Sequence, residues 1–425
     1  MKQIHLNGFT QNSPAPHSPG LWRHPEDEGT RHAVQVPLHD PLLPIAAMAQ
    51  ETSHLGFAPT YSATYTQPYK LARQFSTLDH LTKGRVGWNI VTSYLESEAV
   101  NQGLPTRIEH DTRYDRADEY MDVVYKLWER SWEDDAVVRD LARATYADPA
   151  RVHPIGHKGK FFNVPGVHLV EPSIQRTPVL FQAGSSARGR DFAARHAEAI
   201  FTTTQNSIEE LRVFARDIRG RARGFGRRPE DVLIIPGIVP VIGATEQDAA
   251  RRYEELKSYV SFEGTLALLS GHTGVDLSGF DPDAYVTNVA TNGSHGFLQQ
   301  YALDPDRKWT VREAIQNHGL GIGAMKVVGT PEQIADRLQQ MVFEGDVDGF
   351  NIIQAVSPGT LRDFVDHVVP ILQQRGLFRT EYETGTLREH LFGKGHVRLP
   401  QRHPARQVTV PGAALEKAAP LLQAV

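Results

Sequence analysis

The chain contains no cysteine, and this absence excludes several kinds of chemistry at once. Disulfide bonds, thiolate metal sites and a cysteine nucleophile all need a residue that the 425-residue chain lacks. It also lacks an apolar run of membrane-spanning length, and residues 1–5 show no signal-peptide core. We therefore expect a cytoplasmic protein that does not interact with a membrane.

A strong excess of charge is also missing. The 45 Lys and Arg residues against 50 Asp and Glu residues give a formal net charge of −5, which does not indicate a nucleic-acid-binding surface. Hydrophobic residues make up 40% of the chain, an ordinary share for a globular protein with a large core. The histidines His17 and His24 lack the spacing of a metal-binding helix, so we expect no metal site.

Strand-like apolar runs alternate with amphipathic helical patterns along most of the chain. The strand-like runs lie at residues 4–9, 55–62, 84–92, 199–203, 232–242 and 349–355, and another ends at Phe181. Helical patterns lie at residues 41–54, 69–80, 113–132, 191–199, 207–223, 245–259, 331–345 and 361–375. This order favours a parallel sheet with crossover helices. A (β/α)8 barrel fits better than a three-layer sheet, because no glycine fingerprint opens the first βα unit.

The long barrel domain is expected to span residues 1–391, with residues 392–425 as a C-terminal tail that contains a short helix at 413–422. Within the domain, residues 261–326 are interpreted as an insertion between two barrel units. Its segments 271–274 and 292–296 are rich in glycine and polar residues, and we expect both to be loops.

The segment 179–190 (VLFQAGSSARGR) is the strongest local pattern. An apolar strand stops at Gly184, Ser185 and Ser186, and a helix follows. Backbone N–H groups at a helix N-terminus, together with two hydroxyls, form a site for an anion such as phosphate. The alternative is a helix merely capped by serine, since serine is a favoured N-cap residue.

Three further groups of residues are candidates for contact with a ligand. Asn89 and Thr92 end a strand, where a barrel places its active site, although turns favour the same residue types. His110 and Tyr114 are four residues apart at a helix start and share one face, either to hold an anion or as ordinary half-buried side chains. His17 lies in the loop after the first strand, which either covers the barrel mouth or packs on the surface.

Residues 71–93 (LARQFSTLDHLTKGRVGWNIVTS) resemble the signature of the bacterial-luciferase-like FMN-dependent monooxygenases. The resemblance is to the branch of nitrilotriacetate monooxygenase component A, dibenzothiophene-sulfone monooxygenase and long-chain alkane monooxygenase. The His110 and Tyr114 helix start and the segments 182–186, 375–379 and 385–389 match the same branch. The resemblance extends from Ala33 to Leu391 and includes the first strand.

The resemblance implies a TIM-type (β/α)8 barrel that binds reduced FMN supplied by a separate NAD(P)H-dependent flavin reductase. With O2, such an enzyme oxygenates a small organic substrate of the sulfone, aminopolycarboxylate or alkane type. The match assigns the FMN phosphate to Ser185 and Ser186 and places Asn89 and Thr92 near the flavin. It assigns flavin contact and catalysis to His110 and Tyr114, with His17 also catalytic. A homodimer or homotetramer is implied as well.

One departure from this family pattern lies near the start. The branch has a helix and a second strand after the first loop, and this strand ends in an acidic residue beside the flavin. A βα unit needs about 30 residues, and the interval between Pro25 and Val36 is too short for one. We therefore expect a seven-stranded or breached barrel. The alternatives to a working enzyme of this type are a weakly active or non-catalytic flavin-binding remnant and a deazaflavin-dependent oxidoreductase.

Overall fold

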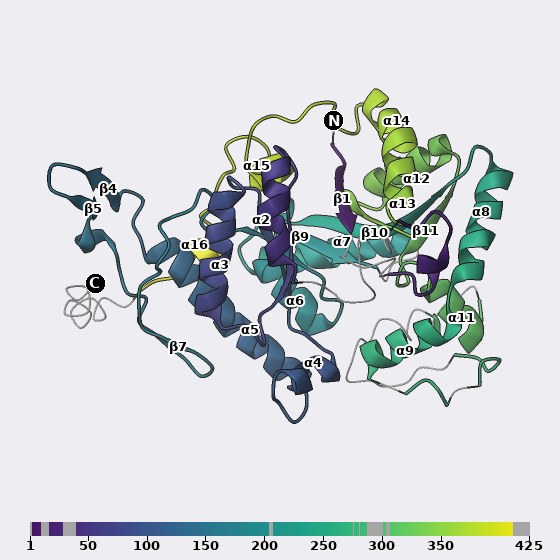
Figure 1. Cartoon of the computed structure of the whole chain (residues 1–425), viewed down its shortest axis with the longest axis horizontal. Helices are drawn as coiled ribbons and strands as arrows, with labels where there is room; N and C mark the ends of the chain where they lie inside the picture. The colour runs from purple at the N-terminus through teal and green to yellow at the C-terminus, as the bar shows by residue number, and fades with distance from the viewer. Residues whose placement is uncertain are drawn as a thin grey trace.

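The computed structural model describes residues 2–9, 17–28, 40–203, 207–274, 276–279, 281–286, 301–302 and 307–410. Eight parallel strands in these residues form one curved sheet (Figure 1). The strands are β1 (His5–Phe9), β2 (Thr60–Ser62), β3 (Gly87–Val91), β8 (Val179–Gln182), β9 (Ala199–Thr202), β10 (Leu233–Ile242), β11 (Met325–Gly329) and β12 (Gly349–Ile353). The predicted α/β fold with a parallel barrel-type sheet is therefore confirmed.

The strand order shows where the barrel is open. The path runs β1-β12-β10-β9-β8-β3-β2, and β11 pairs separately with the second half of β10. Hence β1 and β2 form the two ends of the seven-stranded path, and no hydrogen bond joins them among the residues described. A closed barrel has no such ends. The described residues thus contain the breach expected from the missing βα unit.

Amphipathic helices cover the outer face of the sheet. They are α2 (Leu42–Glu51), α3 (Pro68–Leu81), α5 (His110–Tyr125), α6 (Ala187–His196), α7 (Ile208–Gly224), α8 (Glu246–Tyr259), α12 (Pro331–Glu344), α13 (Gly359–Asp363) and α14 (Val369–Gln374). Phe75 of α3 illustrates the packing, because its ring lies 5.8 Å from that of the fully buried Trp88 on β3. The long helices α3, α7 and α12 thus bury apolar stripes, as their sequence spacing predicts.

The insertion is more ordered than its composition indicates. Segment 271–274 was expected to be a loop, but helix α9 (Phe262–Thr273) continues through most of it. Ser261 caps this helix by accepting a hydrogen bond from the Gly264 N–H, and Leu269 packs against Ile315 of α11 (Val311–His318). The loop prediction was wrong because these long-range apolar contacts outweigh the low helix propensity of glycine. Segment 292–296 lies outside the described residues.

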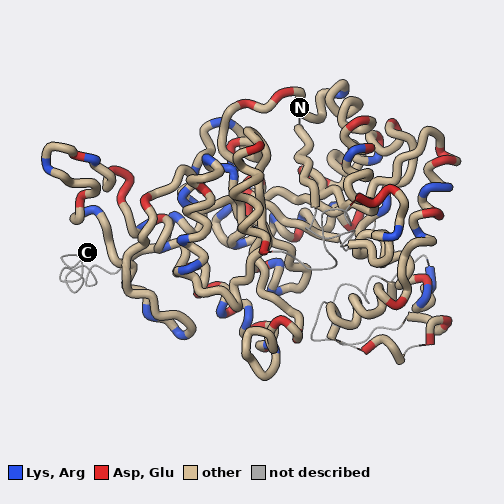
Figure 2. Tube along the Cα trace, in the orientation of Figure 1, with Lys and Arg blue, Asp and Glu red and all other residues tan. Residues whose placement is uncertain are grey.

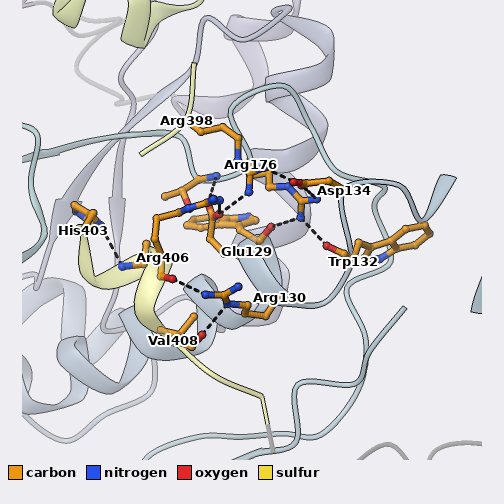
Figure 3. A network of polar contacts seen from close by, with 12 residues as sticks. Glu129, Arg130, Trp132, Asp134, Arg176, Arg398, His403, Arg406 and Val408 are labelled. Carbon is orange, nitrogen blue, oxygen red and sulfur yellow. Dashed lines mark hydrogen bonds and ion pairs between the residues drawn. The ribbon is translucent and has the colours of Figure 1, made fainter. Parts of the chain in front are cut away.

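Residues 393–410 follow helix α15 (Leu387–Phe392) and run against the outside of the barrel. Figure 3 shows the polar network that holds them. Arg398 and Arg406 both donate to the buried carboxylate of Glu129, and Arg402 forms an ion pair with Asp231. Residues 393–410 are therefore attached by several charge-assisted contacts, while the predicted helix at 413–422 lies outside the described residues. The domain boundary at residue 391 stays a prediction.

Two further properties of the described residues concern membrane-spanning helices and the distribution of charge. None of their helices is both long enough and apolar enough to cross a membrane. Positive and negative side chains are interspersed over most elements, as Figure 2 shows. This distribution agrees with the small net charge of the sequence.

Candidate functional site

The carboxyl ends of β3 and β8 bring most of the predicted site residues together. His110 is the first residue of α5, and Ser186 is the N-cap of α6. The His110 Nε2 and Ser186 Oγ atoms lie 3.2 Å apart, within hydrogen-bonding distance. Two helices that follow different strands of the sheet thus begin next to each other at the mouth of the barrel.

Tyr114 completes this group. Its ring meets that of His110 edge-on at 5.1 Å, as their spacing of four residues predicts. Burial raises the pKa of the Tyr114 hydroxyl, and hydrogen bonds with Thr92 and Ser186 offset part of that rise. The hydroxyl therefore stays protonated at neutral pH and is available as a hydrogen-bond donor. We call Thr92, His110, Tyr114 and Ser186 the polar quartet.

Two glycines allow the strand end and the helix start to approach each other closely. A Cβ atom added at Gly184 would lie 2.8 Å from the Gly189 Cα atom, and one added at Gly189 would lie 2.7 Å from the Tyr114 hydroxyl. The Gly189 N–H donates to Ser186 Oγ at 3.0 Å, so the serine-cap interpretation is confirmed. Capping leaves other N–H groups of the first helical turn without intrahelical acceptors, so the same turn can also receive an anion.

Arg188 adds positive charge beside the polar quartet. Its guanidinium lies 5.4 Å from the centre of the Tyr114 ring and donates to the Asp118 carboxylate. Asp118 also accepts from His196 Nε2 at 3.1 Å. These contacts place Asp118 on the side of α5 that faces α6. Asp118 lies four residues after Tyr114, and this spacing was the available signal of their shared face.

Glu119, the next residue of α5, contacts a different part of the chain. It is enclosed by the loop after β6 (His157–Lys158) and accepts hydrogen bonds from the N–H groups of Phe161 and Phe162. It also contacts His157 Nε2 at 3.2 Å. Glu119 therefore holds this loop against α5. The sequence carries no signal of this contact, because the N–H groups that Glu119 binds are about 40 residues away in sequence.

Asn89 and Ser185 offer further polar atoms. Asn89 donates from Nδ2 to Thr60 Oγ1 at 2.8 Å, while its buried Oδ1 atom has no hydrogen-bond partner in the described part of the chain. Within that same part, the Ser185 hydroxyl has no partner, and the Ser185 carbonyl accepts from Arg190 Nε at 3.0 Å. A buried acceptor without a partner is costly, which marks Asn89 Oδ1 as a position for a ligand donor.

His17 lies at the other side of the mouth, after β1. Its ring stacks on Phe9 at 4.5 Å, and Phe9 contacts Phe201 of β9 at 4.8 Å. Burial lowers the pKa of His17 to about 4, and its Nε2 atom has no hydrogen-bond partner within the described ranges. No contact between described residues joins His17 to the polar quartet, so the structure does not bring all the predicted catalytic residues together.

The described residues contain no group of acidic or histidine side chains suited to a metal ion. The mouth instead offers an anion site at one side, aromatic rings in the middle, and two buried polar atoms without partners, Asn89 Oδ1 and His17 Nε2. These features suit a phosphate-bearing, planar organic cofactor such as FMN. They are typical of a barrel oxidoreductase with its cofactor site at the carboxyl ends of the strands.

The family comparison is more specific. The chain belongs to the luciferase-like monooxygenase family, whose model matches residues 25–348. The predicted family is therefore confirmed.

Individual relatives agree with this assignment. A long-chain alkane monooxygenase from Geobacillus thermodenitrificans (strain NG80-2) is 44% identical and covers 95% of this chain and 97% of its own. A dibenzothiophene-sulfone monooxygenase from Rhodococcus erythropolis is 42% identical over 85% of this chain and 80% of its own. The crystal structure of a riboflavin lyase with modified FMN and riboflavin matches with a TM-score of 0.88 and 34% identity. That match covers 96% of this chain and all of the lyase chain (100%).

The alignment with the alkane monooxygenase also bears on the missing unit. It spans 447 positions, which is more than the 425 residues of this chain. The relative therefore has residues without a counterpart here. This agrees with the short interval before Val36 and with the open seven-stranded path.

Proposed function

We propose that this chain acts as a two-component monooxygenase that takes reduced FMN from a separate NAD(P)H-dependent flavin reductase. The observation that carries this proposal is the polar quartet at the N-terminus of α6, in a chain of the luciferase-like monooxygenase family. Bound reduced FMN supplies the electrons with which O2 is split, so that one oxygen atom enters an organic substrate and the other leaves as water.

The residues at the mouth of the barrel have different roles in this proposal. Ser185, Ser186 and the first N–H groups of α6 bind the phosphate, with Arg188 as a nearby positive charge. Thr92, His110 and Tyr114 orient the cofactor from the neighbouring helix start, and Asn89 Oδ1 accepts a hydrogen bond from it. His17, whose ring stacks on Phe9, contacts the reacting partners from the other side.

The proposal includes a small organic substrate of the alkane, sulfone or aminopolycarboxylate type. It also includes a cytoplasmic location and assembly into a homodimer or homotetramer. A weakly active remnant and a deazaflavin enzyme are the competing functions, and no observation on the described residues favours either over the FMN-dependent one.

The test measures cofactor binding and oxygen transfer separately. The wild type and the Tyr114→Phe variant are titrated with FMN, and binding is followed by quenching of flavin fluorescence. We expect weaker binding in the variant, by roughly tenfold, because a hydrogen bond to a charged group is typically worth about 1.5–3 kcal/mol. With a flavin reductase, NADH and labelled O2, a panel of alkane, sulfone and nitrilotriacetate substrates should yield one labelled product class. Wild type without measurable FMN binding contradicts the proposal.

A further inference from the structure

Lys326 lies on the face of the sheet that packs against the loop around Gly321. In the register of β10 and β11, Lys326 pairs with Val239, so the two side chains project to the same face. Val239 packs with Leu21 and Leu320, and Gly321 approaches it so closely that an added Cβ atom would collide with it. This face of β11 is therefore covered by the loop around Gly321.

That loop connects Lys326 to the site already described. The N–H group of Gly321 donates to the His17 carbonyl at 2.8 Å and also to Ser18 Oγ at 3.0 Å. The ammonium group of Lys326 donates to the Asn317 carbonyl, at the end of α11, at 2.7 Å. Lys326 thus contacts the last turn of α11. This helix ends at His318, three residues before Gly321, whose N–H group contacts the His17 carbonyl.

Lys326 has no acidic partner within the part of the chain that the structure describes. Among the described residues, no Asp or Glu carboxylate forms an ion pair with its ammonium group, and the Asn317 carbonyl satisfies only one of its three protons. Burial lowers the pKa of Lys326 to about 7. A charged amine buried without a counter-ion is costly, so the neutral form of Lys326 is favoured until an anion binds beside it.

Other basic side chains surround this position. His318, next to Asn317, is buried, and the charges of Lys326 and His272 add to the burial that lowers its pKa. His272 on α9 acts in the same direction on His17 and meets the Tyr94 ring edge-on at 5.6 Å. We call His17, His272, His318 and Lys326 the basic cluster.

The elements packed on β11 do not neutralise it. Glu246 of α8 and Arg337 of α12 line the groove between those helices together with the residues of β11, Lys326 included. Glu246 is hydrogen-bonded to the Gln333 amide, on the side of the groove. Among the described residues, no ion pair or hydrogen bond joins Glu246 to a member of the basic cluster.

We propose that the substrate of this enzyme carries a carboxylate, which binds at the mouth with the Lys326 ammonium as its counter-charge and the histidines of the basic cluster as hydrogen-bond donors. The inference rests on the proposed function and selects the carboxylate class among its substrates. A neutral alkane or sulfone leaves the lysine without a counter-ion. A carboxylate supplies the charge-assisted hydrogen bonds that the buried amine lacks.

The test uses succinate as the probe and its uncharged diamide as the matched control ligand. Calorimetric titrations of the full-length protein at pH 7.5, in two buffers of different ionisation enthalpy, report both affinity and proton uptake. We expect succinate to bind and the diamide not to bind. We also expect proton uptake on succinate binding, because burial lowers the pKa of the Lys326 amine and a carboxylate beside it raises that pKa again.

Variants assign the effect to the lysine. Lys326→Met should weaken succinate binding at least tenfold and abolish the proton uptake. Lys326→Arg should bind succinate without proton uptake, since a guanidinium is always charged. Lys257→Met, which breaks a surface ion pair with Glu254 on α8, should behave as wild type. If Lys326→Met does not fold, the proton uptake of the wild type still decides the question.

Several outcomes overturn the inference. They are wild-type binding of succinate without proton uptake, equal binding of the diamide, no binding of succinate, or a Lys326→Met variant that loses only thermal stability. The last result would make Lys326 a cap of α11 and nothing more. FMN titrations on the same samples separate the two proposals: a wild type that does not bind FMN defeats the proposed function, whereas unchanged succinate binding in Lys326→Met defeats this inference alone.

Discussion

Ser186 illustrates how one side chain serves both the fold and the site. Its hydroxyl accepts from the Gly189 N–H as the cap of α6 and also lies beside His110 and Tyr114. The sequence allowed either a structural cap or an anion site at this position. The structure contains the cap, and its place within the polar quartet makes both roles compatible. A substitution here therefore changes two measurable quantities, which a matched variant can separate.

We expect Ser186→Ala to lower the free energy of unfolding by about 1 kcal/mol through loss of the cap. It should also weaken FMN binding roughly tenfold through loss of a contact to the charged phosphate. Ser207→Ala is the control, because Ser207 caps α7 with the same geometry, accepting from the Glu210 N–H at 3.1 Å. Urea unfolding should show similar losses in both variants, and FMN titration should show a loss in Ser186→Ala alone. Equal FMN affinities in the two variants would contradict the phosphate role.

At the scale of helices and strands, local patterns in the sequence predict most of the barrel. The apolar runs around Trp88 and at 232–242 form β3 and β10, and Thr245 caps α8 as its position indicates. The pattern fails in the insertion, where α9, α11 and β11 form through contacts between distant residues such as Leu269 and Ile315. The same reason explains why Lys326 gave no signal: nothing local shows that its strand pairs with Val239.

The missing βα unit is the element-scale feature that the sequence predicts best, because its length alone decides it. Among the residues described, its physical consequence is an edge of β2 with which no other strand pairs. The N–H groups of Phe57 and Ala63 donate toward the β3 side, to the carbonyls of Arg85 and Val91. Because strand N–H groups alternate in direction, those of Thr60 and Ser62 point away from β3, toward the open end of the path.

Hydrogen exchange should reveal this edge. We expect the amides of Thr60 and Ser62 to exchange at least tenfold faster than those of Tyr61 and Ala63, since exposed donors are not protected by the sheet. Amide-resolved exchange followed by NMR or mass spectrometry measures the difference. The amides of Ile90 and Phe181 on interior strands provide the protected reference within the same protein. Equal protection of the four positions from Thr60 to Ala63 would mean that another segment hydrogen-bonds to this edge.

At the scale of the whole molecule, buried histidines couple stability to pH. Burial lowers the pKa values of His5, His17 and His168 from 6.5 to about 4. Between pH 6.5 and pH 4 the unfolded chain therefore binds more protons at these positions than the folded chain. Their contribution to stability is complete above pH 6.5 and is lost as the pH falls toward 4.

We therefore expect the free energy of unfolding to fall as the pH is lowered from 7 to 5, by up to about 1.4 kcal/mol per pH unit for each such histidine. Urea unfolding at a series of pH values measures this slope. His168→Gln should reduce it by about one proton, since glutamine does not titrate and keeps a donor near Ser76 Oγ, which lies 2.9 Å from His168 Nε2. The exposed His396→Gln should leave the slope as in the wild type. Equal stability at pH 5 and pH 7 would contradict the prediction. It would mean that these histidines bind protons in the folded protein as readily as in the unfolded chain.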